Sequence, residues 1–170
     1  MAIREFNAGE PIAYFITWTS YGTWLPGDER GWWRNGEWQS PNALFRDMAT
    51  AELKEKPFAL SANDRDVVEQ AIAKHSGIRS WTLHAVSART NHVHVVVTAF
   101  NYKPQTVCAQ FKAWSSRKLK STYPSRARFW TEGGSCRWIN DEDDLARVII
   151  YVSEAQDRKN LDVRPQHGSE

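Results

Sequence analysis

Residues 91–97, with the sequence Asn-His-Val-His-Val-Val-Val, constrain the fold more than any other stretch of the chain. β-Branched residues dominate this segment and a short polar turn precedes it, which is the pattern of a β-strand. Successive side chains of a strand point to opposite faces, so His92 and His94 share one face. Two neighbouring imidazoles can bind one divalent metal ion, because neutral imidazole nitrogen is a common metal ligand. The same pattern also fits a half-buried strand with a polar outer face, and the sequence leaves both interpretations open.

Length and composition indicate one globular domain. The chain has 170 residues, enough to bury a core, and its net charge of +2 is too small to identify a partner. The two cysteines, Cys108 and Cys136, lack the spacing of a zinc site or a disulfide framework, which favours a reducing compartment. No segment is apolar for long enough to be a signal peptide or a membrane span. We therefore expect a cytoplasmic protein with no membrane partner.

Hydrophobic patterning predicts further strands and helices around the two-histidine strand. Strands are expected at residues 12–19, at 81–88 and at the end of 129–139, and helices at 61–78, 104–121 and 142–158. The close spacing of 81–88 and the two-histidine strand predicts an antiparallel hairpin. The tail, residues 161–170, is predicted to be loose.

Residues 20–58 interrupt this pattern with a tryptophan-rich insertion. Four of the nine tryptophans lie there, interleaved with glycines, prolines and arginines: Trp24, Trp32, Trp33 and Trp38. This many tryptophans argues against disorder, and the Asn35-Gly36 pair suits a short hairpin. We predict a long ordered loop or insertion, which could stack unpaired bases, form a small accessory core or make a dimer contact.

A run of positive charge follows the hairpin. Residues 112–128 contain no acidic residue and six basic ones: Lys112, Arg117, Lys118, Lys120, Arg126 and Arg128. A run of one sign in a nearly neutral protein is a candidate contact for DNA phosphates, although most charge runs are simply solvated helix faces.

The last predicted helix carries polar residues at informative positions. At about 100° per residue, four apolar residues form a stripe that should face the sheet: Leu145, Val148, Ile149 and Val152. Gln156 falls on the same stripe, Glu154 falls on the opposite side, and Tyr151 lies on the flank. Taken alone, Tyr151 fits an ordinary rim aromatic and Gln156 a residue of a frayed helix end.

Together these elements resemble a known family. The hairpin with Asn91-His92-Val93-His94, the helix with Lys112, the segment with Trp130 and two glycines, and the final helix with Tyr151 are similar to the single-tyrosine (Y1) HUH transposases. These are the IS200/IS605-like group and its REP-associated relatives. The resemblance covers roughly residues 12–19 and 81–158, and it leaves the tryptophan-rich insertion outside.

The resemblance implies both a fold and a site. The implied fold is α+β, with an antiparallel sheet of four or five strands flanked by helices in the ferredoxin-like arrangement of HUH nucleases. His92 and His94 match the paired metal ligands, and Tyr151 matches the nucleophile. Relatives usually carry a third ligand, a glutamine, four residues after the tyrosine. Here position 155 is alanine and the glutamine is Gln156, which the helical wheel favours over Glu154 because only Gln156 points at the sheet.

The implied activity is cleavage and strand transfer of single-stranded, hairpin-bearing DNA. It would use Mg²⁺ or Mn²⁺ and a 5′-phosphotyrosine intermediate, in a homodimer where the tyrosine acts on its own or its partner's metal site. Two other functions remain compatible with the residues. One is a non-catalytic hairpin-binding protein derived from a transposase, and the other is a Rep- or relaxase-like nicking enzyme.

Overall fold

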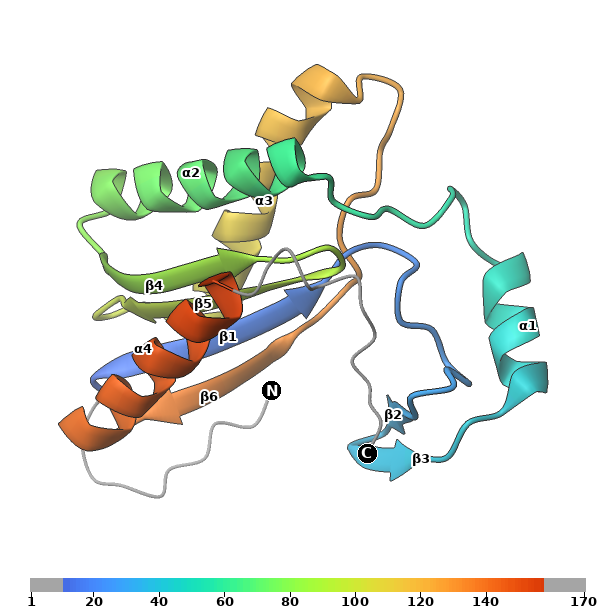
Figure 1. Cartoon of the computed structure of the whole chain (residues 1–170), viewed down its shortest axis with the longest axis horizontal. Helices are drawn as coiled ribbons and strands as arrows, with labels where there is room; N and C mark the ends of the chain where they lie inside the picture. Colours follow the sequence, from blue (N-terminus) through green and yellow to red (C-terminus); the bar gives the residue numbers. More distant parts are fainter. Residues whose placement is uncertain (1–10, 158–170) are drawn as a thin grey trace.

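The computed structural model describes the backbone of residues 11–157 and the side chains up to residue 154. Its strands are β1 (Ala13–Thr19), β2 (Trp32–Arg34), β3 (Glu37–Gln39), β4 (Thr82–Ala88), β5 (His92–Thr98) and β6 (Ser135–Ile139). Its helices are α1 (Ala43–Ala51), α2 (Ala62–Ile78), α3 (Pro104–Thr122) and α4 (Glu142–Asp157). Four strands form an antiparallel sheet in the order β4-β5-β1-β6, flanked by helices (Figure 1). The predicted α+β fold is confirmed, with four strands in the sheet.

The two-histidine strand β5 lies between β1 and β4. The pairing of β1 with β5 places Thr17 opposite His94 and Thr19 opposite His92. Paired residues of an antiparallel sheet point to the same face, so these four side chains share one face. The valines that alternate with the histidines point to the other face and are buried there, as Val93 is. The predicted hairpin of β4 and β5 is confirmed.

Helices α2 and α3 cover the face opposite the histidines. The core on this face includes Trp18 of β1 and Phe111 of α3, both almost fully buried, and their rings stack with centroids 6.5 Å apart. Helix α2 begins with the capping box expected for a helix start, because Ser61 and Asp64 bond each other's backbone N–H. The larger hydrophobic core therefore fixes one face of the sheet and leaves the histidine face to α4.

Helix α4 packs on the histidine face, against β4 and β5 (Figure 1). Its contact forms a second, smaller core that joins Val96 and Ile139 of the sheet to Leu145, Val148 and Val152 of the helix. The apolar stripe predicted from the helical wheel is thus confirmed.

The tryptophan-rich insertion forms a hairpin and a short helix beside the sheet (Figure 1). Strands β2 and β3 pair around Asn35 and Gly36, whose φ angles of 52° and 83° lie in the left-handed region that tight hairpin turns require. The predicted hairpin is confirmed. Helix α1 was not predicted, because it has only nine residues and lies in a segment interrupted by glycines and prolines. None of its residues is buried. Its Leu44 remains 68% exposed.

Two further predictions from the sequence concern membrane-spanning segments and the C-terminal tail. Within residues 11–157, the helices are too short or too polar to cross a bilayer. The predicted loose tail, residues 161–170, lies outside the described residues.

Replacing a ring of the larger core tests this packing. Phe111→Ala removes a side chain that is 0% exposed, and we expect the free energy of unfolding to fall by about 3–5 kcal/mol in chemical denaturation because a cavity remains. Phe100→Ala is the matched control, since Phe100 is 63% exposed, and it should change the free energy by less than about 0.5 kcal/mol. Equal losses in the two variants would contradict this core.

Candidate active site

His92 and His94 lie together on the sheet face that α4 partly covers. Their ring centroids are 4.7 Å apart and the ring planes meet at 73°. His94 is 8% exposed, whereas His92 is half-buried. The prediction that both rings share one face is confirmed, and they are close enough to be two ligands of one ion.

The Nδ1 atom of each ring is held by a neighbouring side chain. His92 Nδ1 donates to Asn91 Oδ1 at 2.7 Å, and His94 Nδ1 lies 2.9 Å from Thr17 Oγ1 on the adjacent strand. A hydrogen bond at one ring nitrogen fixes the orientation of a metal-binding histidine and directs metal binding to the other nitrogen. The sequence analysis missed Thr17, which only the pairing of β1 with β5 brings beside His94.

The electrostatic surroundings keep His92 neutral. Burial, together with the positive charges of Arg89 and Arg30, lowers the pKa of His92 to about 4. At pH 7 its ring therefore has an unprotonated nitrogen, which is the form that binds a metal. Arg30 belongs to the insertion, where its guanidinium donates two hydrogen bonds of 2.7 Å to the Asp28 carboxylate. The insertion therefore reaches within electrostatic range of His92.

Tyr151 approaches the histidines from α4. Its ring centroid lies 6.0 Å from that of His94 and 6.2 Å from that of Phe15 on β1. The side chain is 56% exposed, as expected for a position on the flank of the helix. A phenol beside two imidazoles, on a face open to solvent, can act as a nucleophile toward a bound substrate.

The start of α4 is fixed by charged contacts. Asp141 Oδ1 accepts a hydrogen bond from the backbone N–H of Asp144 at 2.8 Å and so caps the start of the helix. Arg137 of β6 binds the Asp144 carboxylate at 2.7 Å. These contacts, with the apolar stripe, set where Tyr151 lies along the sheet.

The two histidines provide some, but not all, of the ligands that a divalent metal ion needs. Two neutral imidazoles held on one face supply two ligands. Among the side chains that the structure describes, no group of three or more histidines, cysteines, aspartates and glutamates is placed to bind a metal ion. Gln156, the predicted third ligand, has its side chain outside the described residues, and Glu154 is exposed. The histidine pair could therefore hold an ion that takes its remaining ligands from an amide, water or substrate.

The six basic residues of 112–128 lie on α3 and the turn that follows it, and some have structural partners. Lys112 Nζ donates to the backbone oxygens of Thr131, at 2.8 Å, and Gly133. Arg128 pairs with Glu55 at 3.5 Å. Arg117, Lys118, Lys120 and Arg128 are exposed, whereas Arg126 and Lys112 are half-buried. Their role in DNA binding stays a prediction.

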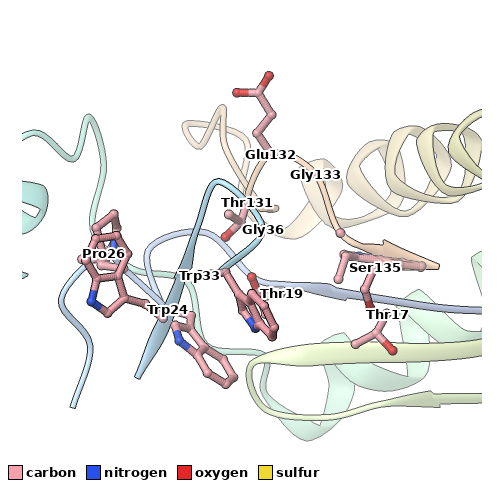
Figure 2. A pocket seen from close by; sticks show the side chains of 14 residues that line it. Thr17, Thr19, Trp24, Pro26, Trp33, Gly36, Thr131, Glu132, Gly133 and Ser135 are labelled. Atoms are coloured by element: carbon pink, nitrogen blue, oxygen red, sulfur yellow. The ribbon is translucent and has the colours of Figure 1, made fainter. Parts of the chain in front are cut away.

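A cavity of about 630 Å³ lies between the insertion and the sheet. Its lining includes Trp24 and Trp33 of the insertion and Thr17 and Thr19 of β1 (Figure 2). The sequence left open whether the insertion stacks unpaired bases, forms a small accessory core or makes a dimer contact, and it could not place the insertion beside β1.

Comparison with solved structures gives distant matches. One is the structure of a REP-associated tyrosine transposase bound to a REP hairpin, with 11% identity and a TM-score of 0.48, covering 89% of this chain and 70% of that one. Another is the crystal structure of a protein provisionally described as a transposase from Deinococcus radiodurans R1, with 14% identity and a TM-score of 0.47, covering 91% of this chain and 97% of that one. No curated protein sequence matches the chain.

A family model gives the decisive match. The model described as transposase, IS200-like, matches residues 50–155, which is more than half of the chain. The matched residues include both histidines and Tyr151, whereas the hairpin of the insertion lies before them. The chain therefore belongs to the IS200-like transposase family.

Proposed function

We propose that this transposase cleaves and rejoins single-stranded, hairpin-bearing DNA through a covalent bond to Tyr151. One observation carries the proposal: the Tyr151 ring centroid lies 6.0 Å from that of His94, which lies 4.7 Å from that of His92. The phenol and the two imidazoles thus lie together on one face of the sheet, which supports our assigning them as nucleophile and metal ligands.

The proposed reaction is a transesterification. The phenol oxygen of Tyr151 attacks the scissile phosphorus, the bond from phosphorus to the 3′ oxygen breaks, and the 5′ phosphate stays on the tyrosine. The phenol loses its proton and the departing 3′ oxygen gains one, so atoms and charge balance. Because the phosphotyrosine conserves the energy of the phosphodiester bond, a second 3′ hydroxyl can reverse the step without a nucleoside triphosphate.

The remaining residues of the proposed site would bind the metal ion and orient the two histidine rings that hold it. His92 and His94 would hold Mg²⁺ or Mn²⁺, with Gln156 as the proposed third ligand, and such an ion supplies Lewis-acid polarisation of the phosphate. The hydrogen bonds at Asn91 and Thr17 keep the two rings in place.

The exposed cations on and after α3 support binding of the DNA backbone. The nearness of Tyr151 to His94 of its own chain supports a site assembled within one chain. A homodimer remains our proposal for the active assembly.

Removing one hydroxyl tests the nucleophile. Tyr151→Phe should abolish the covalent adduct with labelled single-stranded DNA and lower Mn²⁺-dependent nicking at least about a thousand-fold, because the attacking oxygen is gone. Tyr102→Phe, on the opposite face of the sheet, should nick normally. Nicking that persists in Tyr151→Phe would exclude this tyrosine. A wild-type protein that binds hairpin DNA without nicking it would instead support a non-catalytic binding protein.

Metal affinity tests the histidine pair. By calorimetry with Mn²⁺, His94→Ala should lose binding, and Thr17→Val should weaken it about 10- to 100-fold because the orienting hydroxyl is lost. His84→Ala is the control, because His84 Nε2 lies 2.7 Å from Thr98 Oγ1, at the opposite end of β5 from His92. Unchanged affinity in His94→Ala would refute the site.

A further inference from the structure

The cavity beneath the tryptophan hairpin adjoins the two histidines along the sheet. Its floor includes Thr17 and Thr19, which the β1–β5 register places opposite His94 and His92. Adjacent strands are about 4.8 Å apart, so the floor lies one strand from the paired rings on the same face. Thr17 belongs to both places, because its hydroxyl bonds His94 while its side chain lines the cavity. A strand of DNA with a phosphate at the histidines would bring a neighbouring nucleotide to this cavity.

The tryptophans of the cavity wall are held in fixed orientations. Trp24 Nε1 donates to the backbone oxygen of Gly31 at 2.8 Å, and the Arg30 guanidinium lies 4.3 Å from the Trp24 ring centroid. Trp32 Nε1 donates to the backbone oxygen of Ser40 at 3.1 Å. Because these N–H groups are already bonded within the insertion, the indoles contribute rigid apolar surface to the cavity.

Trp33 differs from these two, because it lines the cavity while remaining 65% exposed. Its cross-strand neighbour Trp38 contacts it edge-on, with ring centroids 5.4 Å apart, and does not line the cavity. Figure 2 shows the indole of Trp33 extending from the hairpin toward Thr19. An exposed indole at the rim of a cavity is the arrangement on which unpaired bases stack.

The size and chemistry of the cavity suit a nucleobase. Its volume of about 630 Å³ lies within the range of small-molecule sites, and aromatic walls over a floor of hydroxyl groups match a flat, polar-edged ring.

From this geometry we infer that the cavity binds an unpaired nucleobase of single-stranded DNA, stacked on Trp33, next to the phosphate held at His92 and His94. This inference rests on the proposed function, because it assumes that the histidines face a DNA phosphate. The insertion would thereby select the nucleotide that flanks the cleavage point.

The test compares a DNA strand with bases to one without. Binding of oligothymidylate and of an abasic oligomer of the same length is measured in the Tyr151→Phe background with EDTA, so neither nicking nor metal is involved. Trp33→Ala should weaken oligothymidylate binding about 5- to 150-fold and leave abasic binding unchanged, because only the stacking contribution is lost. Trp33→Phe should restore most of the affinity.

The matched control is Trp38→Ala, which removes the same cross-strand ring pair from the same hairpin but leaves Trp33 in place. It should bind both oligomers as the parent does. Equal weakening by Trp33→Ala and Trp38→Ala would overturn the inference, as would equal loss of oligothymidylate and abasic binding in Trp33→Ala. A lowered dimer affinity with unchanged DNA binding would also overturn it, in favour of a contact between two copies.

Failure of base binding in the cavity can be distinguished from failure of the proposed cleavage chemistry. Nicking by the wild-type protein without a base-dependent effect of Trp33 would reject the cavity alone. A base-dependent effect in a protein that never nicks would retain the cavity and reject the chemistry.

Discussion

The pairing register of β1 with β5 is the constraint on which the rest of the site depends. It sets Thr17 beside His94 and Thr19 beside His92, so one strand supplies the imidazoles and the next supplies both an orienting hydroxyl and the floor of the cavity. A slip of one residue would turn every side chain of a strand to the other face. The large buried residues of β1, above all Trp18, prevent such a slip because they would have to enter the histidine face.

The position of Tyr151 follows from apolar packing rather than from any polar contact at the site. Val148 and Val152 bury themselves against the sheet, and Tyr151, on the flank of the same turns, is thereby held beside His94 while remaining exposed. A nucleophile that must reach a large DNA substrate has to be exposed and yet precisely placed. Packing of the helix on one side and freedom of the ring on the other satisfy both demands.

Much of this arrangement could be predicted from local pattern. Strand alternation placed His92 and His94 on one face, and helical periodicity separated Tyr151 from the buried stripe, because each rule concerns residues near one another in the chain. The relation of Thr17 to His94 could not be predicted, since it depends on the pairing of distant strands. Helix α1 was missed because its apolar residues span little more than one turn of a nine-residue helix, too short a stretch to establish a helical period among the surrounding glycines and prolines.

The central place of β1 in the sheet has a consequence for folding. β1 precedes the other described strands along the chain, and its partners β5 and β6 are synthesised only after the insertion and α2. The hairpin of β4 and β5 needs only a short loop to close, whereas β1 must join across a long sequence separation, which slows the search for native contacts. Until β5 emerges from the ribosome, the largely apolar β1 has both of its edges unpaired, which leaves it open to aggregation.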